Sequence, residues 1–235
     1  MIPLLAALAL ALSPQSVDLG QPVRMNGAPY APMTMGAKPQ GLDGRAITLF
    51  NGSNWSQWVD RQGKPSAWEI KPEGAILVKG GDALTTREFG DAQIHLEFRC
   101  PNIEGATGQA RGNSGVYIQG RYEVQVLDSY GGPPKENGCG GIYGQATPLV
   151  NACAPPEFWQ TYDIVFRAPR FDDKGAVTEK PRLTVFQNGV VIHNNIELSG
   201  PTGGAIAENM VPTGPLLLQD HGDPVMYRNI WIRPL

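Results

Sequence analysis

Short segments in which apolar and polar residues alternate, separated by glycine and proline, constrain the fold of this chain most strongly. In residues 93–100 one predicted strand face carries Ile94, Leu96, Phe98 and Cys100, and the other carries Gln93, His95, Glu97 and Arg99. The 29 glycines and 21 prolines are scattered between such segments, which indicates many turns. Because no segment keeps a 3.6-residue period, the pattern predicts strands rather than helices.

Further strands or hairpins are predicted at 47–50, 67–70, 74–80, 161–168, 182–195 and 216–234, with another pair joined by Gly120. Asn188-Gly189 suits the tight turn of the 182–195 hairpin. About a dozen short antiparallel strands imply an all-β fold, a two-sheet antiparallel jelly-roll sandwich of the concanavalin A or laminin-G kind. We expect one domain over residues 46–235. Its core should contain Ile94, Leu96, Phe98, Val124, Val126, Ile164 and Phe166.

The N-terminal apolar run, residues 2–12, is too short to span a bilayer and lies where the apolar region of a secretory signal would lie. We therefore expect a signal peptide at residues 1–16, a lead-in segment at 17–45, and an exported, periplasmic or secreted protein without membrane insertion after signal removal. The basic residues that usually precede such a run are missing, so a buried N-terminal helix is the alternative.

The charge and the cysteine content of the chain exclude several classes of partner and metal site. A formal net charge of −3 gives no footprint for nucleic acid or anionic lipid, so neither is expected as a partner. The three cysteines lack the spacing of a zinc site. For an exported chain we expect a disulfide between Cys139 and Cys153, which flank a Gly- and Pro-rich loop, while Cys100 packs as a small hydrophobe.

The most informative polar segment is GNSGVYIQGRYEVQVLDSYG, residues 112–131. Glu123 and Gln125 project from one face of its second predicted strand, and Tyr117 lies on a face of the first. A cluster of Asn, Tyr, Glu and Gln flanked by glycines is typical of a cleft that binds sugars, although a solvated sheet face would look similar. The polar faces of 93–99 and 217–221 are expected to share this cleft.

Several motifs together resemble the 3-keto-disaccharide hydrolase family over about residues 46–235. They are LFNGSNWSQW, EFR, GNSGVYIQGRYEVQVLD, GGIYGQATPLVNA, PPEFWQTYDIVF, FQNGVVI and GPLLLQDHGDPVMYRNIWIRPL. The resemblance implies a concanavalin-like jelly roll, export from a bacterial cell, and cleavage of glycosides already oxidised to a ketone at carbon 3 of the sugar. Such a ketone acidifies the hydrogen on C2, so that a base can start β-elimination of the aglycone, and water then adds back.

This chemistry needs a base over C2, an electropositive group at the C3 oxygen, and an acid for the leaving oxygen. A divalent cation could supply the second requirement. We assign the acid–base roles to Glu123, His221 and His95, and a tentative metal site to His95 and Glu97. The expected substrate-binding residues are Asn113, Tyr117, Gln125, Asp128, Tyr143, Trp159, Gln219 and Arg228.

Arg228 is ambiguous, because strict alternation places it with the core residues Ile230 and Ile232. Either its strand contains a bulge or Arg228 is structural. Two other functions also fit. Glu123, Gln125 and Asp128 approach the E-x-D-x-x-E motif of retaining sandwich glucanases, but an amide replaces the middle acid. A non-catalytic carbohydrate-binding domain is the other alternative. The oligomeric state and the aglycone stay open.

Overall fold

The computed structural model describes residues 45–235. The expected signal peptide at 1–16, and the lead-in segment at 17–45 apart from Arg45, lie outside the described residues. Within residues 45–235 no helix is long and apolar enough to cross a membrane. The helix that is present there is a single 3-10 turn, η1 (Gly108–Ala110).

All other regular elements are strands. They are β1 (Ile47–Phe50), β2 (Trp58–Val59), β3 (Glu69–Ile70), β4 (Ile76–Leu77), β5 (Ala83–Phe89), β6 (Ala92–Arg99), β7 (Ser114–Ile118), β8 (Tyr122–Val126), β9 (Gln160–Arg167), β10 (Arg170–Phe171), β11 (Val177–Glu179), β12 (Arg182–Gln187), β13 (Val190–Glu197), β14 (Gly214–Leu218) and β15 (Met226–Pro234). The all-β prediction is confirmed.

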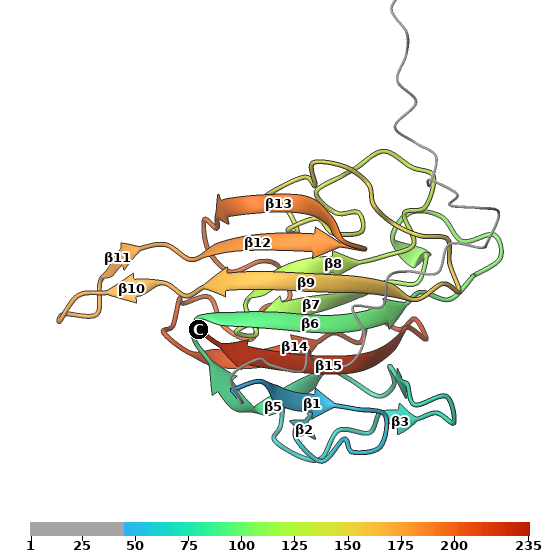
Figure 1. Cartoon of the computed structure of the whole chain (residues 1–235), viewed down its shortest axis with the longest axis horizontal. Coiled ribbons are helices and arrows are strands. Elements are labelled where there is room, and N and C mark those ends of the chain that lie inside the picture. Colours follow the sequence, from blue (N-terminus) through green and yellow to red (C-terminus); the bar gives the residue numbers. More distant parts are fainter. Residues whose placement is uncertain (1–44) are drawn as a thin grey trace, which may run out of the picture. The chain divides into compact units, whose positions relative to one another are not determined.

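The strands form two antiparallel sheets, as the jelly-roll prediction required. The large sheet has the order β13-β12-β9-β6-β15-β4-β3, with β1 also paired to β15. The small sheet has the order β2-β5-β14-β7-β8 and lies behind the large sheet in Figure 1. The hairpin β10–β11 forms a separate two-stranded ribbon that projects from one end.

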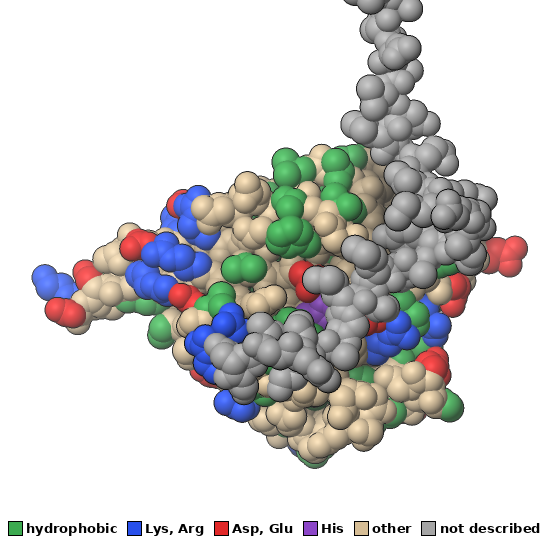
Figure 2. Space-filling model, viewed as in Figure 1, with side chains coloured by type: hydrophobic (Ala, Val, Ile, Leu, Met, Phe, Trp, Pro, Cys, Tyr) green, Lys and Arg blue, Asp and Glu red, His purple; other side chains and the backbone are tan. Residues whose placement is uncertain are grey.

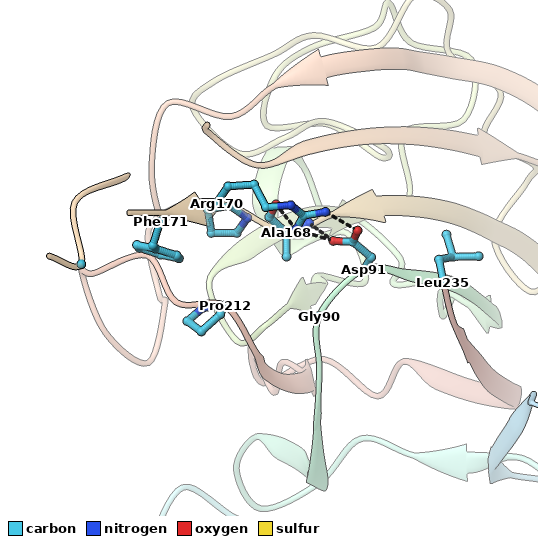
Figure 3. A pocket seen from close by; sticks show the side chains of 9 residues that line it. Gly90, Asp91, Ala168, Arg170, Phe171, Pro212 and Leu235 are labelled. Carbon is cyan, nitrogen blue, oxygen red and sulfur yellow. Dashed lines mark hydrogen bonds and ion pairs between the residues drawn. The ribbon is translucent and has the colours of Figure 1, made fainter. Parts of the chain in front are cut away.

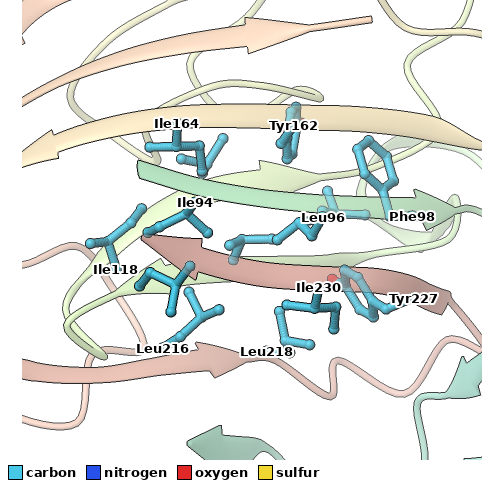
Figure 4. Close-up of a cluster of buried hydrophobic side chains, with 14 of the residues drawn as sticks. Ile94, Leu96, Phe98, Ile118, Tyr162, Ile164, Leu216, Leu218, Tyr227 and Ile230 are labelled. Carbon is cyan, nitrogen blue, oxygen red and sulfur yellow. The ribbon is translucent and has the colours of Figure 1, made fainter. Parts of the chain in front are cut away.

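The hydrophobic core fills the space between the inner faces of the two sheets. Side chains from β6, β9 and β15 meet side chains from β7 and β14 there (Figure 4). The predicted core residues are all at most 1% exposed: Ile94, Leu96, Phe98, Val124, Val126, Ile164 and Phe166. Burying a large apolar side chain stabilises a fold by about 1.5–3 kcal/mol, so two-residue alternation here identified the main stabilising set.

Two backbone irregularities bear on the sequence predictions. Asn188 and Gly189 have φ values of 52° and 79°, which are the left-handed angles that the predicted tight hairpin turn needs. In β15 the pairing with β6 breaks between Arg228 and Trp231, and Asn229 has φ 48°. This bulge turns Arg228 away from the core, so the bulge alternative for Arg228 is correct.

The expected disulfide is wrong in this structure, because Cys100, Cys139 and Cys153 are all free and buried. Other contacts fix the ends of the loop. The Cys139 amide donates to Ser129 Oγ at 2.9 Å, and the Cys139 thiol contacts Tyr162 OH at 3.3 Å. Hydrogen bonds therefore fix the ends of this loop in place of the expected covalent bridge.

Candidate functional site

The predicted site residues lie on two opposite faces of the sandwich. His95 and Glu97 alternate with the core residues of β6, so they project from the outer face of the large sheet. Glu123 alternates with Val124 of β8 and projects from the outer face of the small sheet. Since the whole core separates these faces, the expectation that 93–99 shares a cleft with 117–125 is wrong.

On the large sheet, His95 and Glu97 belong to a closed polar network. His95 Nδ1 lies 2.7 Å from Asp163 Oδ1, and its ring stacks on Trp231 with centroids 5.2 Å apart. Arg228 Nε donates to Glu97 at 2.6 Å and Asn229 Nδ2 donates to the other oxygen at 2.9 Å. Each group already has partners, and His95 is fully buried. We therefore infer that this network stabilises the fold.

The network also accounts for two other predicted residues. Trp159 is covered by the guanidinium groups of Arg228 and Arg99, at 4.1 Å and 4.9 Å from its ring centroid, a stacking that leaves it away from Glu123. Among residues 45–235 no group of three or more His, Cys, Asp or Glu side chains could hold a metal ion. The tentative His95–Glu97 metal site therefore lacks a ligand set. On the same side of the molecule, exposed apolar side chains gather over β12 and β13 (Figure 2).

On the small sheet, Glu123 and Tyr117 form the centre of the candidate site. They are direct cross-strand partners on β8 and β7, because the turn at Gly120 fixes that register. Tyr117 OH lies 2.8 Å from Glu123 Oε2, and Gln219 Nε2 donates to Tyr117 OH at 3.1 Å. Gly115 makes room for this pair, since a Cβ there would lie 2.4 Å from Glu123 Oε1.

Burial changes the acidity of both groups. Glu123 is 3% exposed and pairs with neither Arg99 nor Arg121. Desolvation raises the pKa of the Glu123 carboxyl to about 7, although the contact with Tyr117 acts in the opposite direction. Desolvation, followed by the charge of Glu123, raises the pKa of Tyr117 well above its usual range. A carboxyl that titrates near neutral pH is suited to acid–base chemistry.

Three amide groups around Glu123 have oxygens without a hydrogen-bond partner among the described residues: Asn113 Oδ1, Gln125 Oε1 and Gln219 Oε1. Buried polar atoms in native proteins nearly always have a partner, so such a cluster indicates a place for a polar ligand or water. Gln109 of η1 accepts from Gln125 at 2.9 Å and from Asn113 at 3.1 Å. No sequence pattern pointed to Gln109, whose position depends on how the 101–112 loop folds back.

A glycine-containing segment, Thr202–Ile206, crosses the outer edge of the site. Glu123 N donates to Thr202 Oγ1 at 3.0 Å, and Tyr117 OH lies 2.8 Å from the Gly203 carbonyl oxygen. Arg61 Nη2 donates to the Gly204 carbonyl at 2.7 Å, while its Nε contacts Asp82 at 2.6 Å. Arg61, which the sequence did not single out, therefore places a guanidinium beside this segment.

The structure shows no hydrogen bond between Glu123 and Gln219, His221, Asp128 or Tyr143. Gln219 donates its backbone N–H to Gly115 O at 2.9 Å, and His221 follows it as an exposed residue of the next turn. Asp128 forms an ion pair with Arg111 at 2.6 Å, so its carboxylate is already engaged. Tyr143 is partly buried in the loop that pairs with the edge of β8 through Ile142.

A cavity of about 630 Å³ lies elsewhere, beside the β10–β11 hairpin. It is lined by Asp91, Arg170 and Phe171 together with the C-terminal Leu235 (Figure 3). Arg170 forms a two-pronged ion pair with Asp91 at 2.9 and 2.5 Å, which holds the pKa of that carboxyl below its usual value. Such a pair offers no free acid or base, so we place the candidate active site at Glu123 rather than at this cavity.

The fold and the site thus define an antiparallel jelly-roll sandwich with a buried, near-neutral carboxyl among unpaired amides on its small sheet. The chain belongs to the 3-keto-alpha-glucoside-1,2-lyase-like family, whose model matches residues 45–233. That family is a glycoside-processing one, and the predicted family is confirmed.

Solved structures agree with this assignment. A candidate glycosyl hydrolase from Parabacteroides distasonis is 40% identical, with 82% of this chain and 84% of that chain covered and a TM-score of 0.75. Two others from the same organism are 19% and 22% identical, cover 81% of this chain and 94% and 99% of theirs, and have TM-scores of 0.59 and 0.56. These two share the fold. No curated protein matches the chain.

Proposed function

We propose that this chain cleaves glycosides whose sugar carries a ketone at carbon 3, with Glu123 as the base that removes the proton from C2. The observation that carries the proposal is the buried Glu123 carboxyl, with a pKa of about 7, beside three unpaired amide oxygens. Family membership supports the same substrate class. An oligosaccharide or small glycoside is the expected partner, because amide oxygens accept hydrogen bonds from sugar hydroxyls.

The reaction balances as an elimination followed by a hydration. The Glu123 carboxylate takes the C2 proton, and the electron pair of that C–H bond forms an enolate with the C3 carbonyl. The enolate re-forms the ketone and a C1–C2 double bond, while the C1–oxygen bond breaks and the aglycone leaves as an alcohol after protonation. Water then adds its oxygen to C1 and a proton to C2, so the net change is hydrolysis.

The surrounding residues have separate tasks in this scheme. His221, exposed beyond Gln219, protonates the leaving oxygen. Arg61 is already held by Asp82 and by the Gly204 carbonyl, so the scheme assigns it no catalytic role. The retaining-glycosidase alternative needs a second free carboxylate, whereas Asp128 is held by Arg111. Since the described residues do not converge as a metal site, no step is routed through a cation.

The test compares the wild-type chain with Glu123→Gln on a 3-keto-glucoside and on the unoxidised glucoside, with and without chelator. Glu104→Gln is the matched control, because Glu104 is an exposed loop residue. Loss of a general base should lower kcat by about 10²–10⁴-fold in Glu123→Gln. The control should keep the wild-type rate, and a chelator should leave the wild-type rate unchanged.

Isotope exchange tests the mechanism separately. In deuterated solvent, deuterium should appear at C2 of the product, because the C2–H bond breaks before the aglycone leaves. Equal cleavage of the unoxidised glucoside, or a product without deuterium at C2, would show that elimination from a keto-sugar is wrong.

A further inference from the structure

The hydroxyl of Tyr117 has more acceptors around it than it has hydrogens. It lies 2.8 Å from Glu123 Oε2 and 2.8 Å from the Gly203 carbonyl oxygen, and it accepts from Gln219 Nε2 at 3.1 Å. A phenol has one hydrogen to donate, and a carbonyl oxygen can only accept. With Glu123 ionised, two acceptors compete for that single hydrogen, and one close oxygen–oxygen contact stays without a proton.

Protonation of Glu123 removes this conflict. The carboxylic acid then donates to Tyr117 OH, which accepts from Gln219 as well and gives its own hydrogen to Gly203 O. The proton of Glu123 and the hydroxyl hydrogen of Tyr117 then each have one acceptor. With Glu123 neutral, Tyr117 can therefore keep its hydrogen bond to Gly203 O, whereas the ionised carboxylate competes for the same hydrogen.

We propose that Tyr117 is a positioning residue that couples the proton on Glu123 to the closure of Thr202–Ile206 over the site. When Glu123 loses its proton to solvent, the Tyr117 hydrogen turns from Gly203 O to Glu123, and the segment loses its central attachment. The base therefore becomes active in the same step that loosens the cover above it. This coupling concerns the free protein and does not depend on the identity of the substrate.

The segment is attached at both ends, so losing one contact loosens it without unfolding it. Thr202 N donates to Arg121 O at 2.8 Å, and Ile206 N donates to Gly120 O at 2.9 Å. Between them Gly203 and Gly204 are exposed. Gly204 has φ +81°, and a Cβ there would lie 2.6 Å from Tyr117 OH, whereas a Cβ on Gly203 would meet nothing within 4 Å. Gly204, but not Gly203, therefore lies in close contact with the phenol of Tyr117.

The neighbouring charges do not compete with Glu123 as the titrating group. Arg61 and Asp82 are the charged residues that act on Tyr117 from the adjoining loops, and they neutralise each other as an ion pair at 2.6 Å. Arg121, in the turn before β8, is engaged with Asn209 O and Gln119 O. Near neutral pH this leaves Glu123, whose pKa is about 7, as the group that changes charge at this contact.

Hydrogen exchange of the full chain without substrate tests the coupling. The reporters are the amides of Thr202 and Ile206, and amides of β6 serve as the reference for global unfolding. Because ionisation of Glu123 costs the segment one hydrogen bond, the opening constant should rise about fivefold between pH 5 and pH 8 after correction for intrinsic chemistry. The β6 amides should show no such step.

Two variants separate coupling from simple packing. In Glu123→Gln the amide donates to Tyr117 as the acid does but does not titrate, so the pH step should vanish and the segment should stay closed. Tyr117→Phe removes the hydrogen for Gly203 O, so opening at pH 5 should rise about fivefold, the worth of one hydrogen bond. At pH 8, where that hydrogen has already turned to Glu123, Tyr117→Phe should have no effect.

Gly204→Ala should open the segment at every pH, and its matched control Gly203→Ala should exchange like the wild type. A pH step that persists in Glu123→Gln, or a Tyr117→Phe effect of equal size at pH 5 and pH 8, would overturn the coupling. Because these measurements involve no substrate, they can fail while Glu123 remains the catalytic base, and they can succeed if the proposed reaction is wrong.

Discussion

Replacing Gly115 by alanine should disable the site while leaving the sandwich folded. The Cα of Gly115 faces Glu123 and Tyr117 on the outer side of β7, and its backbone angles are ordinary for a strand, so alanine adds no backbone strain. The new Cβ would lie 2.4 Å from Glu123 Oε1 and 2.8 Å from Tyr117 Cε2. Ordinary van der Waals contact begins at 3.4 Å, so the carboxyl must move by about 1 Å.

A displacement of about 1 Å in a reacting group costs about 100-fold in rate, which corresponds to about 2.7 kcal/mol of transition-state stabilisation. The stability cost should be of similar size, about 1–3 kcal/mol, because the added methyl group overpacks the buried Glu123–Tyr117 contact. We therefore expect kcat/KM on a 3-keto-glucoside to fall about 100-fold in Gly115→Ala, with a cooperative unfolding transition retained.

Initial-rate kinetics and thermal unfolding of the same preparations give the result. Gly203→Ala is the matched control, since its Cβ would meet nothing within 4 Å although Gly203 lies beside the same tyrosine. A folded Gly115→Ala variant with wild-type kcat/KM would refute the placement of Glu123 at the reacting carbon, because its carboxyl could not have stayed where it is.

Three further predictions concern the stability of the fold and the state of its thiols. Because the folded-state pKa of Glu123 is raised to about 7 from 4.5, the stability that its proton contributes is full below pH 4.5 and is lost as pH rises through 7. In urea unfolding, Glu123→Gln should therefore gain about 2–3 kcal/mol relative to wild type between pH 5 and pH 8, and a constant difference would contradict the raised pKa. Arg228→Ala leaves the buried Glu97 without its cation and should lower the free energy of unfolding by about 3 kcal/mol in denaturant titration. The variant should keep the wild-type kcat, because Arg228 lies on the face opposite to Glu123. A loss of kcat in folded protein would show that Arg228 belongs to the active site. Thiol titration of unreduced, denatured protein should count three free thiols, and a count of one would restore the Cys139–Cys153 bridge.

Two-residue alternation predicted the local part of this fold well. It placed Ile94, Leu96 and Phe98 in the core, and it placed Tyr117 and Glu123 on the same face of two strands that Gly120 joins. These predictions needed only the geometry of a strand and a short turn, both of which are encoded within a few neighbouring residues.

Alternation could not tell which sheet a strand joins. His95 and Glu97 were assigned to the face of their own strand correctly, but β6 pairs with β9 and β15 while β8 pairs with β7, and that choice depends on contacts distant in sequence. The strand β5, ALTTREF, went unrecognised because its apolar and polar residues do not alternate. Arg61 and Gly203 reach the site from loops, for which no periodic signal exists.

The strand that carries Glu123 is also the last strand of its sheet, and this position has a consequence for association between molecules. A bare sheet edge is a template on which another chain can add a strand. Here Gly141 O accepts from Gln125 N at 2.9 Å on one half of the β8 edge, and Thr202 Oγ1 accepts from Glu123 N at 3.0 Å on the other. Thr202 N and Ile206 N also donate to Arg121 O and Gly120 O in the turn before β8. The segment that closes the site thus also protects β8 from edge-to-edge aggregation. Wide opening of that segment would expose the unpaired backbone groups of β8, and the risk of self-association limits how far the site can open.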